Sequence, residues 1–315
     1  MGIILSIVVP VYNEANMLPV TINRLSGILN EMINADVVDK GSYILFVDDG
    51  SVDNSWSILK ETCQTNSDIR AIKLSKNFGH NSALLAGLMA VKDRCGAAIS
   101  IDCDLQQDPD AIPLFLEKHL AGAEIVFGIR NDRKADSYFK KYTALGFYNL
   151  MKVMGVNLHV NHADYRLLSA KALKALAEYQ EPNIFLRAVC IDIGFTNDVV
   201  YFDVTDREHG TSKYSFLKML KFALNGITSF SSFPLRMISI LGGAVFGLSL
   251  LMTSYVLFKT IFVGDVVPGW ASTVLPIYLL GGLQILCLGI VGEYLAQIYN
   301  AAKKRPRYIV ETELF

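Results

Sequence analysis

The 315-residue sequence predicts an α/β fold with a mostly parallel sheet, followed by two membrane-crossing helices near the C-terminus. Two observations support this prediction. Apolar, β-branched runs alternate with helical patterns of ten to fifteen residues, which is typical of a doubly wound sheet with helices on both faces. Residues 237–258 and 266–292 are uncharged runs of 22 and 27 residues, each long enough to cross a hydrocarbon core of about 30 Å. Two buried core helices are the alternative interpretation of these runs.

The alternation of strands and helices begins at the N-terminus. Residues 3–11 form an apolar run that ends at a turn containing Pro, Tyr, Asn and Glu, and residues 17–32 place apolar side chains at helical spacing. Ser51 or Asp53 is expected to cap the second helix. The predicted strands are residues 3–11, 43–51, 69–75, 97–102, 123–130, 189–193 and 199–204, and the predicted helices are residues 17–32, 52–62, 82–94 and 170–178.

Polar side chains follow four of these strands at the point where each strand ends. They are Asn13 with Glu14, Asp48 with Asp49, Asn77, and Asp102 with Asp104. In an open parallel sheet, ligands bind beyond the carboxyl ends of the strands. The sequence therefore predicts a binding cleft at this edge of the sheet.

The segment "AAISIDCDLQQDPD" places a cluster of aspartates directly after a buried strand. Burying unpaired carboxylates is costly, so the cluster must reach solvent or meet a cation. Asp102 and Asp104, two positions apart, project to the same side of an extended segment and can bind one hard divalent cation together with phosphate oxygens. Neither G-x-x-x-x-G-K-[ST] nor G-x-G-x-x-G is present, so a diphosphate would be held by metal and side chains.

Charge distribution sets the expected topology. The net charge of −1 gives no electrostatic case for nucleic acid, and five cysteines without paired short spacing fit a reducing compartment. Basic residues flank both apolar runs, as in cytoplasmic loops. The sequence therefore predicts residues 1–213 as a cytoplasmic domain, 214–234 as a juxtamembrane segment in the headgroup region, 235–293 as a transmembrane hairpin and 294–315 as a basic cytoplasmic tail.

A group of phosphate-binding side chains is predicted before the membrane runs. Guanidinium, ammonium and hydroxyl groups there would suit a phosphate at the membrane surface, and a solvated basic face is the alternative. The group consists of Arg130, Arg133, Lys134, Ser137, Lys140 and Lys141.

Five motifs carry a resemblance to a known family: "SIVVPVYNEA", "FVDDGSVDNS", "LSKNFGHNSALLAGL", "IDCDLQQDPD" and "HADYRLLS". With the two C-terminal apolar runs, the chain resembles the GT-A family 2 glycosyltransferases over nearly its whole length. More narrowly, it is similar to the polyisoprenyl-phosphate glycosyltransferases, which include bactoprenol glucosyltransferases and relatives of dolichol-phosphate mannose synthase.

The resemblance implies roles on the donor side. Pro10, Tyr12 and Glu14 would line a uridine pocket, and Asp48 or Asp49 would bond the uracil, although a helix-capping role is the alternative for one of these two aspartates. Mg²⁺ or Mn²⁺ would be bound by Asp102 and Asp104 together with the diphosphate. Asn77 and Gln106 complete the expected nucleotide-sugar site.

On the acceptor side, the resemblance places Asp164 near the reacting centre, as an orienter of the acceptor or as a base, with Arg166 as its partner. A turn or cap role is the alternative for Asp164. In the segment "DREHGTSKY", Arg207, Ser212 and Lys213 match a turn that closes on phosphates. With Arg130, Arg133, Ser137 and Lys140, they form the expected site for the lipid phosphate.

The reaction implied is an inverting transfer of a hexose from a UDP-sugar to undecaprenyl phosphate at the bacterial inner membrane. Glucose is the first choice of sugar, and N-acetylglucosamine the second. A separate flippase would move the lipid-linked sugar, which would modify a cell-surface polymer. An assembly of several copies, such as a tetramer, stays open.

Three other functions stay open. One is a transferase for an aminoarabinose-type sugar. Another is a processive polysaccharide synthase, although its Q-x-x-R-W segment is absent. The third is an inactive membrane scaffold or flippase partner.

Overall fold

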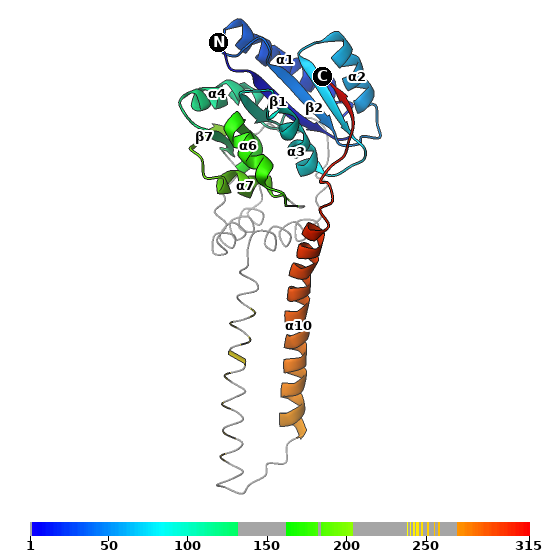
Figure 1. Cartoon of the computed structure of the whole chain (residues 1–315), viewed down its shortest axis with the longest axis vertical. Helices are drawn as coiled ribbons and strands as arrows, with labels where there is room; N and C mark the ends of the chain where they lie inside the picture. The colour runs from blue at the N-terminus through cyan, green and yellow to red at the C-terminus, as the bar shows by residue number, and fades with distance from the viewer. Residues whose placement is uncertain are drawn as a thin grey trace. The chain divides into compact units, whose positions relative to one another are not determined.

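The structure is a computed structural model that describes residues 2–131, 162–181, 184–203 and 270–315, with isolated positions between 238 and 258. The described residues up to 203 belong, with residues 305–315, to one compact unit. The helix α10, Trp270–Ala302, belongs to a second unit up to residue 304. Figure 1 shows the sheet-containing unit with its layers of helices.

The first unit is built on one sheet of eight strands, in the order β7-β5-β6-β4-β1-β2-β3-β8. The strands β4, β1, β2 and β3 are adjacent and parallel to one another, and β5 is parallel to β7. The strand β6 runs antiparallel to β4 and β5, and β8 runs antiparallel to β3. The α/β fold with a mostly parallel sheet is therefore confirmed. The strands are β1 Leu5–Val11, β2 Tyr43–Asp48, β3 Ile69–Leu74, β4 Ala97–Ser100, β5 Ile125–Arg130, β6 His162–Ser169, β7 Asn197–Phe202 and β8 Val310–Leu314.

Helices cover both faces of the sheet because its central strands are apolar on both sides. Leu5, Ile7 and Val9 of β1 pack in one core with the apolar stripe of α1. Val8, which alternates with them, faces α3, where a Cβ on Gly87 would lie 2.4 Å from its side chain. The helices of this unit are α1 Leu18–Asn34, α2 Ser55–Thr65, α3 His80–Val91, α4 Ile112–Leu120, α6 Ala170–Glu178 and α7 Leu186–Asp192, with a short 3₁₀ turn at Pro109–Ala111.

Two sequence predictions about local structure are wrong. Residues 189–193 were expected as a strand, but Leu186–Asp192 form α7, because a short apolar run fits a buried helix as well as a strand. The second helix has Asn54 as its N-cap, not Ser51 or Asp53, although Asp53 Oδ1 accepts from the N–H of Ser55, the first residue of the helix, at 3.0 Å. The strands β6 and β8 and the helix α4 were not predicted.

The C-terminal segment returns to the sheet as a strand rather than ending as a tail. β8 pairs antiparallel with β3, and Lys73 lies 2.9 Å from Glu311 across this pair. The guanidinium of Arg94 also stacks over the ring of Phe315 at 4.1 Å. These contacts cover the edge of β3, which would otherwise expose unpaired backbone groups.

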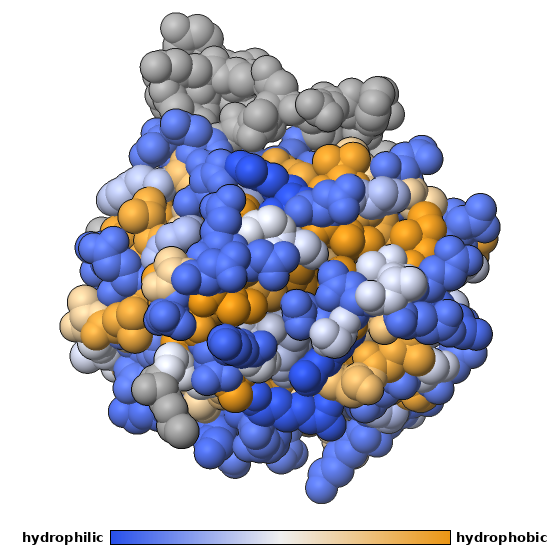
Figure 2. All heavy atoms as spheres, turned by 90° about the horizontal axis from the view of Figure 1, so that it is seen from above, coloured by the Kyte–Doolittle hydropathy of each residue, from blue (hydrophilic) through white to orange (hydrophobic). Residues whose placement is uncertain are grey.

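Within the described part of the chain, no helix is both long and apolar enough to cross a membrane. Most of the predicted run at 237–258, and all of the juxtamembrane segment 214–234, lie outside the described residues. The face of the molecule in Figure 2 mixes hydrophilic side chains with apolar patches.

We expect Gly50→Ala to lower the free energy of unfolding by at least about 2 kcal/mol. Gly50 has a φ of +68°, and a Cβ there would lie 2.4 Å from the carbonyl carbon of Lys76. Urea denaturation measures the loss. Gly194→Ala is the matched control, because Gly194 has nearly the same φ, +71°, but its Cβ position meets only an ordinary contact, 3.7 Å from the carbonyl oxygen of Asp192. Equal losses in the two variants would contradict the role of the close backbone approach.

Candidate active site

The turn after β1 is held by side chains from the segment that follows β2. The backbone N–H of Asn13 donates to Ser51 Oγ at 2.9 Å, and that of Glu14 donates to Ser55 Oγ at 3.0 Å. The N–H of Ala15 donates to Asp53 Oδ2 at 3.1 Å. Small hydroxyl and carboxylate side chains thus tie two loops together at the carboxyl edge of the sheet.

Asp49 connects this edge to the loop before α3. Its carboxylate is buried and accepts hydrogen bonds from the backbone N–H groups of Phe78, at 2.7 Å, and Gly79, at 2.9 Å. Burial raises the pKa of Asp49, and these two bonds partly oppose the rise. The carboxylate therefore fixes the loop that begins α3.

Beside Asp49 lies a shallow, open hollow with a volume of about 130 Å³. Four of the predicted nucleotide-sugar residues line it: Pro10, Tyr12, Asp49 and Asn77. The remaining lining residues are Val11, Gly79, His80 and Ala83. Glu14, Asp48 and Gln106, which were predicted for the same site, are not among the residues that line this hollow.

Asp48 has a different environment from Asp49. It is fully buried, and its Oδ2 accepts from the N–H of Ser51 at 3.3 Å. Its Oδ1 has no hydrogen-bond partner within the described residues, and burial raises its pKa. Asp48 thus supports the turn after β2, and of the two aspartates it is Asp49 that reaches the hollow.

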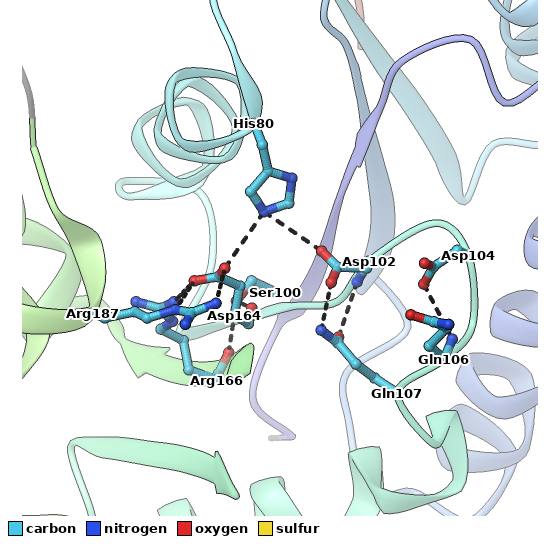
Figure 3. A network of polar contacts seen from close by, with 9 residues as sticks. All are labelled: His80, Ser100, Asp102, Asp104, Gln106, Gln107, Asp164, Arg166 and Arg187. Carbon is cyan, nitrogen blue, oxygen red and sulfur yellow. Dashed lines mark hydrogen bonds and ion pairs between the residues drawn. The ribbon is translucent and has the colours of Figure 1, made fainter. Parts of the chain in front are cut away.

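Asp102 and Asp104 lie in the loop after β4 (Figure 3). The side-chain amide of Gln107 binds both the carboxylate and the backbone of Asp102. Its Nε2 donates to Asp102 Oδ2 at 2.7 Å, and its Oε1 accepts from the Asp102 N–H at 3.0 Å. Asp104 Oδ1 accepts from the N–H of Gln106 at 3.2 Å. These local bonds shape the loop so that both carboxylates are held at the end of the strand.

The pKa of Asp102 is raised. Burial is the largest cause; His80 opposes it, while the charges of Asp164 and Asp104 add to it. A carboxylate whose ionised form is disfavoured in this way gains most from a neighbouring cation.

Asp164 lies on β6 and is bound by two arginines. Arg166, two residues along the same strand, donates from Nη2 to Asp164 Oδ1, as the sequence predicted. Arg187 of α7 donates from Nε to Oδ1 at 3.1 Å and from Nη2 to Oδ2 at 2.7 Å. Burial would raise the pKa of Asp164, but Arg187 and Arg166 outweigh it and hold this pKa well below its usual range.

One ring nitrogen of His80 faces the carboxylates of both Asp102 and Asp164 (Figure 3). Its Nε2 lies 3.6 Å from Asp102 Oδ1 and 3.8 Å from Asp164 Oδ2. His80 is the first residue of α3, so Asp49 fixes its position through the preceding loop. The carboxylates of Asp102, after β4, and Asp164, on β6, therefore face one imidazole.

The donor set fits a hard divalent cation that is shared with a substrate. Asp102 and Asp104 supply carboxylate oxygens from one loop, and the side chain of Asp102 is 31% exposed. Within the described ranges, no group of three or more His, Cys, Asp or Glu side chains is arranged to hold a metal by itself. The remaining ligands would have to come from phosphate oxygens and water.

Most of the predicted lipid-phosphate residues lie outside the described residues: Arg133, Ser137, Lys140, Arg207, Ser212 and Lys213. Arg130 is described at the end of β5, where it is half-buried and its Nε has no hydrogen-bond partner among the described residues. The sequence did not predict His80, Gln107 or Arg187. His80 stands in a quoted motif, but its partners are 22 and 84 residues away in the chain.

Comparisons with known proteins show which family the chain resembles. The family model described as "Glycosyl transferase family 2" matches residues 6–177. A relative from Bacillus subtilis (strain 168), named "Uncharacterized glycosyltransferase YkoT", is 42% identical over 312 residues, which cover 99% of this chain and 92% of the relative. The "Bactoprenol glucosyl transferase" of Shigella phage SfX is 35% identical over 309 residues, covering 98% of this chain and 99% of the relative.

Among solved structures, this chain is similar to glucosyl-3-phosphoglycerate synthase from Mycobacterium tuberculosis in complex with phosphoglyceric acid. The TM-score is 0.50 at 16% sequence identity, and the match covers 72% of this chain and 80% of that one. At this identity the likeness shows the fold alone.

Proposed function

This chain belongs to glycosyl transferase family 2 and has the GT-A fold, and on that basis we propose that it transfers a hexose from a UDP-sugar to undecaprenyl phosphate. Glucose is the proposed sugar, since relatives that are 35% identical over 98% of the chain are named bactoprenol glucosyl transferases. N-Acetylglucosamine is the second candidate.

One observation carries the proposal. The Asp102 carboxylate, which follows β4, and the Asp164 carboxylate on β6, which is bound by two arginines, lie near the same nitrogen of His80. These carboxylates lie close to the hollow that Tyr12, Asp49 and Asn77 line, because His80, which they contact, also lines that hollow. A nucleoside diphosphate sugar in this hollow would place its phosphates toward Asp102 and its sugar toward Asp164.

Asp102 and Asp104 would hold Mg²⁺ or Mn²⁺, which when bound neutralises charge on the leaving diphosphate. Tyr12 and Asn77 would bind the nucleoside, with the loop fixed by Asp49. Asp164 and its two arginines carry a formal net charge of +1, since one carboxylate faces two guanidiniums. This cluster suits an anionic acceptor, and a phosphate needs no base because its oxygens are already ionised at neutral pH.

The membrane part of the proposal rests on the sequence. The uncharged runs at 237–258 and 266–292, with basic residues on both flanks, would form a hairpin that leaves the sheet-containing unit in the cytoplasm. The lipid acceptor would be reached at the surface of the bacterial inner membrane. A separate flippase would then move the product, and the sugar would modify a cell-surface polymer.

The test is transfer of label from a panel of radiolabelled UDP-sugars to undecaprenyl phosphate by the purified full chain in detergent. We expect a chloroform-soluble product from UDP-glucose in the presence of Mg²⁺ or Mn²⁺. A product from another UDP-sugar alone would replace glucose as the donor. No lipid product from any donor, with the protein folded, would contradict the proposed function.

A further inference from the structure

Arg187 makes a two-point contact with Asp164 that joins separate parts of the fold. Arg187 is the second residue of α7, whereas Asp164 lies on β6, 23 residues earlier. Its Nε and Nη2 each donate to a different oxygen of the same carboxylate, at 3.1 and 2.7 Å. Such a bidentate pair fixes both the position and the rotation of a carboxylate, which a single hydrogen bond does not.

The second arginine that binds Asp164 has a different setting. The side chain of Arg166 is 1% exposed, and its Nη1 lies 3.5 Å from the sulfur of Cys190 in the interior. The side chain of Arg187 is 32% exposed. Arg166 is thus part of the packed core between the sheet and α7, while Arg187 lies where the core opens toward solvent.

The remaining neighbours of the Asp164 carboxylate belong to the reaction centre. His80 Nε2 lies 3.8 Å from Asp164 Oδ2, the oxygen that also accepts from Arg187, and the same nitrogen lies 3.6 Å from Asp102 Oδ1. A rotation of the Asp164 carboxylate would therefore change its distance to His80. Small displacements of this kind matter, since a misplacement of about 1 Å in a reacting group costs on the order of 100-fold in rate.

We propose that Arg187 is a positioning residue for hexose transfer, which acts by holding the Asp164 carboxylate in place opposite His80. This inference rests on the proposed function and adds a residue to it. It assigns Arg187 an effect on turnover that passes through Asp164, and it separates this role from the packing role of Arg166.

The experiment compares Arg187→Gln and Arg187→Lys with the wild-type full chain, measuring kcat, the KM for UDP-glucose and the melting temperature. We expect Arg187→Gln to lower kcat about 10- to 100-fold, with the KM within about threefold and the melting temperature within a few degrees. Arg187→Lys, which keeps the charge but not the two-point contact, should recover only part of the rate. Arg24→Gln is the matched control, because Arg24 pairs with Asp110 on the surface with half of its side chain exposed.

A double-mutant cycle tests whether Arg187 acts through Asp164. The Asp164→Asn variant and the Asp164→Asn/Arg187→Gln variant should have the same kcat, since the second change removes an interaction that is already lost. Independent losses that multiply would overturn the inference, as would a wild-type kcat in Arg187→Gln. If Arg187→Gln fails to fold, Arg187→Lys decides, and a wild-type kcat in that variant overturns the inference.

Failure of the inference can be told apart from failure of the proposed function. Wild-type protein that transfers sugar, together with an unaffected Arg187→Gln variant, contradicts the inference alone. Wild-type protein that is folded but forms no lipid product contradicts the proposed function, and the inference falls with it.

Discussion

Replacing Asp102 by asparagine is expected to lower the turnover of hexose transfer at least about 100-fold, and replacing Asp104 likewise. An asparagine oxygen can still accept the hydrogen bond from Gln107, but the side chain no longer supplies a charge for a divalent cation. The loss would appear in initial rates of label transfer from the UDP-sugar to the lipid.

The same substitution at Asp102 is not expected to reduce stability. Burial raises the pKa of Asp102, so the ionised form is less favourable in the folded chain than in the unfolded chain at neutral pH. A neutral asparagine removes this penalty. Urea denaturation should therefore give a free energy of unfolding equal to that of the wild type or higher, as is common where function opposes stability.

The control is Asp110→Asn, eight positions from Asp102 in the same acidic segment. Asp110 is 60% exposed and pairs with Arg24, so its loss should leave the transfer rate nearly unchanged. Wild-type rates in the variants of Asp102 and Asp104 would contradict the metal assignment. An equal loss in Asp110→Asn would mean that the segment acts through its overall charge.

Replacing Arg166 by methionine is expected to lower the free energy of unfolding by about 1–3 kcal/mol. Arg166 is almost completely buried and donates to Asp164 Oδ1, so its removal takes away one of the two guanidiniums that bind this buried carboxylate and leaves Arg187 as the other. Urea denaturation of the full chain in detergent measures the change.

The comparison for Arg166 is Arg24→Met, which removes a surface ion pair and should cost less than about 1 kcal/mol. A cost below about 1 kcal/mol for Arg166→Met as well would contradict the view that Arg166 is required for folding. It would also remove the distinction drawn between Arg166 and Arg187.

The parts of the fold that could be predicted from the sequence are those with a strong local pattern. The strands β1 to β5 are short apolar runs bounded by polar turns, and α6 has the bounds that its helical spacing predicts. The candidate site could be located because several strand ends carry carboxylates or amides. In a parallel sheet, such ends meet at one edge, and Pro10, Tyr12, Asp49 and Asn77 do meet there.

The parts that could not be predicted depend on contacts between distant segments. The strand β6 carries the charged residues Asp164 and Arg166, and the third member of this cluster, Arg187 of α7, comes from a separate element 23 residues after Asp164. The pairing of β8 with β3 joins residues more than two hundred positions apart. Similarly, nothing local in the sequence indicates that His80 would face Asp102 and Asp164.

The central claim is that Asp102, Asp104 and Asp164 serve the transfer of a hexose to a lipid phosphate. The most direct measurement supplies purified full-length protein with labelled UDP-glucose, a divalent cation and either undecaprenyl phosphate or the free alcohol undecaprenol. The account predicts metal-dependent label in the organic phase with the phosphate and none with the alcohol, since the positive cluster of Asp164, Arg166 and Arg187 suits an anion and supplies no strong base. Equal transfer to the alcohol, or transfer that is unaffected by EDTA, would contradict it.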